Sequence, residues 1–325
     1  MSAPTGEQYV ITRGTSRAVI AQLAASLREC SINGVEVTES YPETGTPPFG
    51  DGIVLMPWPN RIEDGIWTLD GKQLQLDLTE PTRHNAIHGL LRNTAYTMVE
   101  HTESAVTLRA TVFPQHGYPF LLDTTVRYEL VDDGLAVTHT VTNLSEAKAP
   151  VAVGTHPFLK IGDVPSEDLV VIVHASTYFD VDERLNPIAE VPVEGTVFDL
   201  REGGRIGDLE LDTAFGGVRT VDGVSAILRA PDGREVRLVQ DEFHPYVQVF
   251  ITPIFPKGLD RPVTDEHDKP IVDDGDYAEL ADGLGTAVAI EPMTAPPNAF
   301  NTGVGVRWVE PGEQWSLGWG IQYAE

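Results

Sequence analysis

A glutamate at the end of an apolar run is the first residue whose chemistry stands out. In "AVAIEPMTAPPNAF" (287–300), Glu291 follows four apolar residues and precedes Pro292. A carboxylate buried in such surroundings is costly unless it finds a partner or its pKa rises. The proline restricts the residue before it to extended geometry, so the direction of the Glu291 side chain is limited. A desolvated carboxylate with a raised pKa is suited to act as a general base near neutral pH.

A histidine stands in the same setting far away in the chain. In "VAVGTHPFLKI" (151–161), His156 ends an apolar run, and Pro157 restricts the backbone in the same way. The ordinary pKa of histidine lies close to neutral pH, which suits a general acid. The two stretches therefore predict one base and one acid, each at a stiffened strand end.

Further polar residues interrupt apolar or glycine-rich context. They are Arg61 in "PWPNRIEDGIWTLDG" (57–71), His88 in "NAIHGLLRN" (85–93) and Asp212 in "LELDTAFGGV" (209–218). Each also has a purely structural interpretation. Arg61 can pair with a nearby acid, His88 can be a core histidine with satisfied hydrogen bonds, and Asp212 can form a turn with its own backbone. Because structural ion pairs produce similar patterns, both interpretations stay open at each position.

Two other histidines, His84 and His139, could belong to a metal site or a sugar site, but the sequence around them argues against both assignments. His84 and His88 have the spacing of metal ligands on one helical face. The following Gly89 and the strand-rich surroundings make a ligand helix unfavourable, so no metal site is predicted. His139 lies on the apolar face of a strand with Val137 and Val141, where a satisfied core histidine is the better interpretation.

Apolar and polar residues alternate with a period of two along most of the chain, which predicts strands. The pattern occurs in 105–113, in 124–145 with a turn at Asp132, Asp133 and Gly134, in 224–240 with a turn at "PDG", in 246–251, and in 305–324 with a turn at "EPGE". Hairpins closely spaced by Gly, Asp and Pro favour an all-β sandwich.

Two segments depart from simple alternation. The stretch 15–30 has helical propensity, but Val19, Ala21 and Leu23 also alternate as in a strand, and the context favours the strand. The stretch 255–285 is rich in Pro, Gly and acidic residues and is predicted to be a long surface loop between two core strands. Because no repeat or low-complexity linker divides the chain, residues 1–325 are predicted to form one domain.

Composition excludes several classes of partner. The chain has 325 residues, of which 41% are hydrophobic, and a formal net charge of -27. This field repels nucleic acid, anionic membrane surfaces and phosphorylated metabolites, and it favours a neutral substrate. The single cysteine, Cys30, predicts neither an internal disulfide nor a cysteine metal site. Without a leader-like start or an apolar run of roughly eighteen residues, a soluble cytoplasmic protein is expected.

Five motifs together carry a resemblance to a known family. "PWPNRI", "NAIHGL", "THPFL", "LDTAF" and "IEPMTAPPNAFNTG" occur in the order and at about the spacing of the aldose 1-epimerase (galactose mutarotase) family. The resemblance implies one large antiparallel β-sandwich with few short helices, a galactose mutarotase-like supersandwich, with a sugar site on one face and no cofactor. It also implies that Glu291 is the general base, that His156 is the general acid, and that Arg61, His88 and Asp212 hold the sugar hydroxyls.

The sequence departs from the family pattern at two of these motifs. The usual His-Pro-Tyr-Phe and Asn run is "HPFLKIG", and the usual His-Gly-Gly is "HGLLR". Both changes alter the pocket wall without removing a catalytic group. The "HGLLRN" form also brings Arg92 close to the site and is similar to that of hexose-6-phosphate epimerases.

The expected activity is interconversion of the α and β anomers of a neutral aldohexose such as glucose or galactose, with a hexose 6-phosphate as the alternative substrate. A non-catalytic sugar-binding protein on the same sandwich is the other alternative. Binding alone does not need His156 and Glu291 together, which favours the enzyme. The sequence leaves open whether the protein is a monomer or a homodimer.

Overall fold

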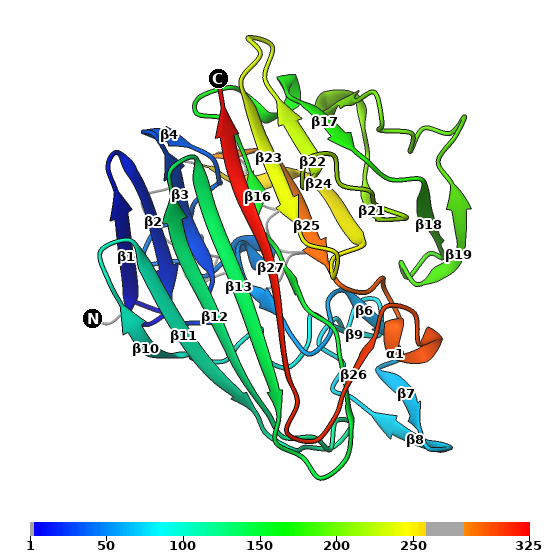
Figure 1. Ribbon diagram of the computed structural model, residues 1–325. Helices are drawn as coiled ribbons and strands as arrows, with labels where there is room; N and C mark the ends of the chain where they lie inside the picture. The colour runs from blue at the N-terminus through cyan, green and yellow to red at the C-terminus, as the bar shows by residue number, and fades with distance from the viewer. Residues whose placement is uncertain (1–2, 258–282) are drawn as a thin grey trace.

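The computed structural model describes residues 3–257 and 283–325, and in these ranges nearly all of the regular secondary structure consists of antiparallel strands (Figure 1). Of the predicted loop 255–285, residues 258–282 lie outside the described ranges. Its two ends belong to β24 (Tyr246–Pro256) and β25 (Leu284–Met293).

Two large sheets form the body of the described fold. One has the strand order β10 (Thr97–His101), β11 (Ala105–Val112), β12 (Leu122–Val131), β13 (Gly134–Asn143), β27 (Gln314–Ala324), β23 (Glu235–Gln240), β22 (Val224–Arg229), β17 (Val170–Val173), β20 (Gly204–Arg205). The other has the order β19 (Pro187–Pro192), β18 (Thr177–Val181), β21 (Asp212–Gly216), β24, β25, β15 (Gly154–Thr155), β5 (Val54–Leu55), and β16 (Phe158–Leu159) also pairs with β25. Val137 and Leu317 of the first sheet share one core cluster with Val249 and Ile290 of the second. The fold is therefore a large antiparallel β-sandwich, as predicted.

Smaller elements surround this sandwich. They are a sheet of β1 (Gln8–Arg13), β2 (Ser16–Ala21), β3 (Leu27–Ile32) and β4 (Val35–Glu36), the pairs β6 (Arg61–Glu63) with β9 (Asn85–Ile87), β7 (Ile66–Leu69) with β8 (Lys72–Gln75) and β14 (Ala149–Val151) with β26 (Arg307–Val309), the 3-10 turns η1 (Pro48–Gly50), η2 (Ser166–Asp168) and η3 (Ile206–Asp208), and the short helix α1 (Ala299–Thr302). None of the helices in the described ranges has the length and apolar character required to cross a membrane.

Most of the predicted strands and turns are confirmed. β12 and β13 are joined at Asp132 and Asp133, β22 and β23 flank "PDG", and β11 and β24 cover 105–112 and 246–251. The strand character predicted for 15–30, in place of a helix, is confirmed, but the stretch forms two strands, β2 and β3, joined as a hairpin. Ala24 and Ala25 adopt positive φ in its turn, and Ser26 donates its hydroxyl hydrogen to the Asp51 carbonyl.

The hairpin predicted in 305–324 is wrong. β26 pairs with β14 instead of with β27, and residues 314–316 of β27 pair with β13. The two strands around "EPGE" therefore belong to different sheets.

The eight-stranded sheet presents two chemically different faces. Val249 and Ile290 point into the core between the sheets. Because successive side chains of a strand alternate between faces, their neighbours Gln248 and Glu291 point to the opposite face. Both are buried even though they lie outside that core, so this face must itself be covered.

Candidate active site

Strand register brings Glu291 and His156 together. Gly154 of β15 pairs with Met293, and Phe158 of β16 pairs with Ala289, all across the edge of β25. His156 lies midway between its two paired residues, and Glu291 lies midway between theirs, so the two side chains face each other. Directly opposite cross-strand residues have Cβ atoms about 5 Å apart, which allows their side chains to touch.

The two side chains are in contact and almost fully buried. His156 Nε2 lies 3.3 Å from Glu291 Oε1, and the residues are 4% and 1% exposed. Burial raises the pKa of Glu291 well above its ordinary value, and the charge of Asp212 adds to this effect. The raised pKa expected from the sequence is confirmed in direction. Burial lowers the pKa of His156 to about 4, so the expectation of a histidine near neutral pH is wrong.

The same row of the sheet continues into β24. Gln248 is the cross-strand partner of Glu291, and its amide nitrogen donates to Asp212 Oδ1 at 2.6 Å. Asp212 begins β21, where it pairs with Phe250, and its side chain is 26% exposed. The structure therefore places the predicted Asp212 beside the Glu291–His156 pair, connected to it through Gln248.

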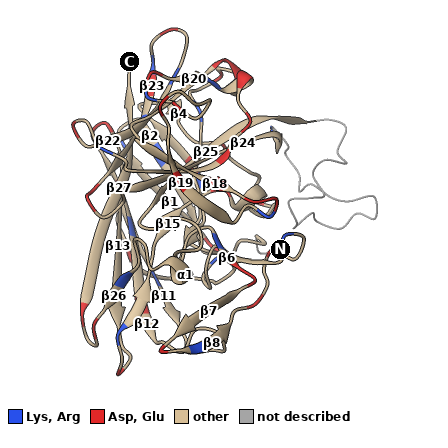
Figure 2. Cartoon of the chain, turned by 90° about the vertical axis from the view of Figure 1, so that its right-hand side faces the viewer, with Lys and Arg blue, Asp and Glu red and all other residues tan. Residues whose placement is uncertain are grey.

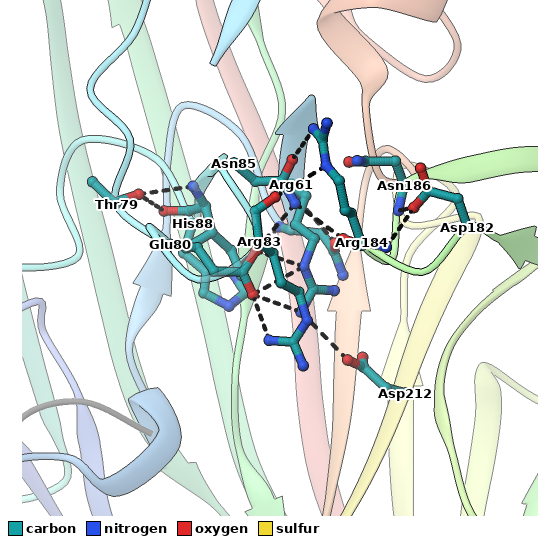
Figure 3. A network of polar contacts seen from close by, with 12 residues as sticks. Arg61, Thr79, Glu80, Arg83, Asn85, His88, Asp182, Arg184, Asn186 and Asp212 are labelled. Atoms are coloured by element: carbon teal, nitrogen blue, oxygen red, sulfur yellow. Dashed lines mark hydrogen bonds and ion pairs between the residues drawn. The ribbon is translucent and has the colours of Figure 1, made fainter. Parts of the chain in front are cut away.

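Arg61 reaches this row from the β6–β9 hairpin. Its Nε and Nη2 donate to the carboxylate of Glu80 at 3.0–3.2 Å, and Nη2 also lies 3.4 Å from Asp212 Oδ2 (Figure 3). Asn85 and Arg83 bind the same Glu80 carboxylate. The Arg61 guanidinium thus lies between two carboxylates. The structural ion pair considered for Arg61 is present, and the residue also lies in the candidate site.

His88 has a left-handed backbone conformation, and the residue after it is a glycine in close contact with another segment. It adopts a φ of 63° and is followed by Gly89, where a Cβ would lie 2.1 Å from the Met56 carbonyl oxygen. The Asn60 N–H donates to His88 Nδ1 at 3.3 Å. The ring packs edge-on against His156 with centroids 5.4 Å apart. Burial lowers the pKa of His88 well below its ordinary value, so its ring is neutral and carries its proton on Nε2.

The segment after Glu291 ties the site together. Thr294 and Val153 exchange hydrogen bonds next to β15, with the Thr294 hydroxyl accepting from the Val153 N–H at 2.9 Å. Asn298 donates its backbone N–H to the Arg61 carbonyl and accepts from the Glu63 N–H. The "TAPPN" stretch (294–298), which follows β25, is thus bonded both to the segment next to β15 and to β6.

The other sequence candidates lie elsewhere. His84 is exposed and hydrogen-bonded to Asp64 at 2.9 Å, and β9 separates it from His88, which confirms that no helix joins them. His139 is buried in the core, where its Nε2 accepts from Trp319 Nε1 at 3.2 Å. No other atom of the described residues bonds its Nδ1, so it is a core histidine satisfied at one nitrogen only.

Sequence reasoning missed Gln248 and Glu80. Gln248 is the one polar residue in the apolar stretch "YVQVF", which was an available signal. Glu80 lies in an ordinary polar turn, and nothing in the local sequence marks it. Arg92 lies near enough for its charge to lower the pKa values of both His88 and His156.

The arrangement can move protons and bind hydroxyl groups. One carboxylate and one imidazole are in contact, and around them stand a neutral imidazole, an amide and an ion-paired guanidinium. Within the described ranges, no group of three or more His, Cys, Asp or Glu side chains could hold a metal ion. The side chains present are those expected for acid–base chemistry on a polyhydroxylated molecule.

Comparison with known proteins agrees with this interpretation. The family model described as aldose 1-epimerase matches residues 7–322. The chain is 28% identical over 312 residues to the Escherichia coli (strain K12) protein named "Uncharacterized protein YihR", covering 95% of this chain and 91% of that one. It is 32% identical to human galactose mutarotase over 163 residues, which are 48% of this chain and 46% of the human one.

Solved structures show the same fold. The GalM/aldose epimerase homologue from C. elegans aligns with a TM-score of 0.78 at 17% identity, covering 98% of this chain and 99% of the other. Galactose 1-epimerase from Lactobacillus acidophilus NCFM aligns with a TM-score of 0.72 at 18% identity, covering 97% and 92%. Because these sequence identities are low, the structural similarity shows a shared fold and nothing further.

Proposed function

The chain belongs to the aldose 1-epimerase family, and from this premise we propose that it interconverts the α and β anomers of a neutral aldohexose such as glucose or galactose. The observation that carries the proposal is the 3.3 Å contact between His156 Nε2 and Glu291 Oε1, made by two buried side chains on facing strands. Anomer exchange requires one base and one acid, and this pair supplies both.

The reaction needs two proton transfers. Glu291 removes the proton of the C1 hydroxyl, and His156 protonates the ring oxygen, so the ring opens and C1 can rotate. Reclosure on the other face reverses both transfers and restores the starting protonation states. Each transfer by a positioned group contributes about a hundred- to ten-thousand-fold in rate.

Burial decides where the proton rests before substrate binds. Because desolvation raises the pKa of Glu291 and lowers that of His156, the shared proton lies on Glu291 in the empty site. The two atoms in contact allow it to pass to His156, which gives the ionised base and the protonated acid. The pair therefore works as one unit holding one proton.

The surrounding residues are assigned to the sugar hydroxyls. His88 offers an Nε2–H donor, Arg61 offers its guanidinium, and Asp212 offers a partly exposed carboxylate. Gln248 joins this set, because its amide oxygen is buried without a partner among the described residues. A donor hydroxyl would satisfy that oxygen.

Several of the cations near the site are already neutralised. Arg61 and Arg83 pair with Glu80, and Lys160 Nζ lies 2.9 Å from Glu36. Figure 2 shows Asp and Glu spread over turns around the molecule, which matches the net charge of -27. These features favour a neutral sugar. The position of Arg92 favours the second candidate, a hexose 6-phosphate, because one arginine supplies much of the bonding a phosphate needs.

A substrate panel tests the proposal and separates the two candidates. Freshly dissolved α-glucose, α-galactose and glucose 6-phosphate are followed by polarimetry, with the uncatalysed rate subtracted. We expect the neutral sugars to equilibrate faster than the phosphate, and Arg92→Ala to change their kcat by less than about threefold. If the phosphate is far faster and Arg92→Ala removes its advantage, the second candidate replaces the first. If no aldose is accelerated, the epimerase assignment is wrong.

The pH profile tests the shared proton. We expect kcat/KM to fall below about pH 4, where His156 and Glu291 both hold a proton and the base is lost. It should fall again above the raised pKa of Glu291, where neither group holds one. The measurement is kcat/KM from acid to alkaline pH with the free sugar. A profile with an acid limb near pH 6.5 would contradict the buried pair, because it would report an ordinary histidine.

A further inference from the structure

A second buried carboxyl, Asp51, lies next to the segment that carries His156 and has no part in the proton transfers above. It follows η1, its exposure is 0%, and its Oδ1 accepts the Phe158 N–H at 3.3 Å. Its Oδ2 is buried without a hydrogen-bond partner among the described residues. A carboxyl in such a place is costly, so its presence calls for an explanation.

The turn that contains Asp51 is hydrogen-bonded to the backbone of His156. The Gly52 N–H donates to the His156 carbonyl at 2.8 Å, and the His156 N–H donates to the Ile53 carbonyl at 3.1 Å. Asp51 extends this contact by two residues, to the Phe158 N–H. On the other side of Phe158, its carbonyl accepts the Glu39 N–H at 2.8 Å. The backbone on both sides of Pro157 is thus fixed from one turn.

The Phe158 ring in turn packs against the imidazole of His156. The two rings stack with centroids 5.3 Å apart and an interplanar angle of 30°. His88 closes on the imidazole edge-on at 5.4 Å, and Phe250 does so at 6.4 Å. The direction of His156 Nε2 toward Glu291 therefore depends on where Phe158 stands.

We propose that Asp51 is a positioning residue for His156, acting through Phe158. This inference rests on the proposed function, in which His156 is the acid. Burial raises the pKa of Asp51 well above its ordinary value, the bond from the Phe158 N–H lowers it and the charge of Glu39 raises it, so the uncharged form is favoured relative to an ordinary aspartate. Asparagine should therefore replace it, because an amide oxygen accepts the Phe158 N–H equally well. Valine has a similar shape but accepts no hydrogen bond.

Kinetics of two substitutions test this role. We expect Asp51→Val to lower kcat by about tenfold to a hundredfold, since a shift near 1 Å can cost that much. KM should change by less than about threefold, because His156 acts mainly in the transition state. Asp51→Asn should keep nearly normal kcat. The matched control is Thr124→Val, which removes a buried hydrogen bond to the Ala110 carbonyl in the other sheet and should change neither constant.

A double substitution tests the route through Phe158. Phe158→Leu keeps the backbone N–H and removes the stacked ring, so it should lower kcat to a similar extent. Adding Asp51→Val to Phe158→Leu should cost little more, because both changes release the same ring. Additive losses would overturn the proposed route, as would normal kcat in Asp51→Val. If Asp51→Val does not fold, normal kcat in Phe158→Leu overturns the route by itself.

The titration of His156 supplies a readout independent of activity. The charged and titratable groups around it are Glu291, His88, Arg61 and Arg92, all on other segments. In ring-selective NMR of the whole protein, assigned with His156→Asn, the His156 pKa should rise from about 4 toward about 6.5 in Asp51→Val, as water reaches the ring. It should stay low in Asp51→Asn. An unchanged pKa in Asp51→Val would overturn the inference, and this test decides it even if the wild-type protein accelerates no mutarotation.

Discussion

Glu291→Gln should abolish mutarotation while leaving the fold intact. The amide has nearly the same shape as the carboxylate, but it cannot accept the proton of the C1 hydroxyl. We expect kcat to fall by roughly 1,000-fold or more, within the range that one positioned proton transfer supplies. The measurement is polarimetry on freshly dissolved α-glucose and α-galactose after subtraction of the uncatalysed rate.

The same substitution should not destabilise the protein. Because burial raises the folded-state pKa of Glu291, its contribution to stability is present below its unfolded pKa and is lost as pH rises through the folded pKa. Glutamine does not ionise and avoids that loss. Thermal unfolding at pH 8 should therefore show a Tm for Glu291→Gln equal to or above that of wild type.

Two outcomes would change the assignment of Glu291. Near-normal turnover in Glu291→Gln would show that another group is the base. If wild type and variant both bind sugar calorimetrically and neither accelerates anomer exchange, the protein is the non-catalytic sugar-binding alternative on this sandwich.

His156→Asn should lower kcat by about a hundredfold or more with a much smaller change in KM. Asparagine keeps a small polar group on the strand but cannot protonate the ring oxygen. The buried pair then lacks its acid, and Glu291 loses the partner 3.3 Å away. Steady-state kinetics over a range of free aldose concentrations separate the two constants.

His88→Asn is the matched control for this experiment. Both histidines are buried, their rings touch, and the pKa values of both are lowered by burial. Only His156 contacts Glu291, so His88→Asn should act mainly on KM. A collapse of affinity with surviving kcat in His156→Asn would make His156 a binding residue instead.

Local sequence was enough to locate most of the strands and the candidate site residues Glu291 and His156. Alternation and turn residues depend on neighbours in the chain, so β11, the β12–β13 hairpin and the β22–β23 hairpin could be predicted. Glu291 and His156 were visible because a charged or titratable group at the end of an apolar run, followed by proline, is unusual in any fold.

The pairing of β2 with β3 and of β26 with β14 could not be predicted in the same way. The segment 15–30 turns at Ala24 and Ala25, where Ser26 is held by the distant Asp51 carbonyl. β26 pairs with β14 although β27 is the next strand along the chain. These choices depend on which edges and contacts remain available in the assembled sandwich, and no short stretch of sequence carries that information.

The sequence by itself determined the chemical types of the site: a carboxylate and a histidine at strand ends, with Arg61, His88 and Asp212 as further polar residues. Only the tertiary structure decided how they meet. The register across β25 sets His156 against Glu291 and adds Gln248, and Glu80 joins through its pairing with Arg61. Desolvation is likewise produced by everything packed around a group, and so burial could lower the pKa of His156 to about 4 although its sequence neighbours suggested an ordinary histidine.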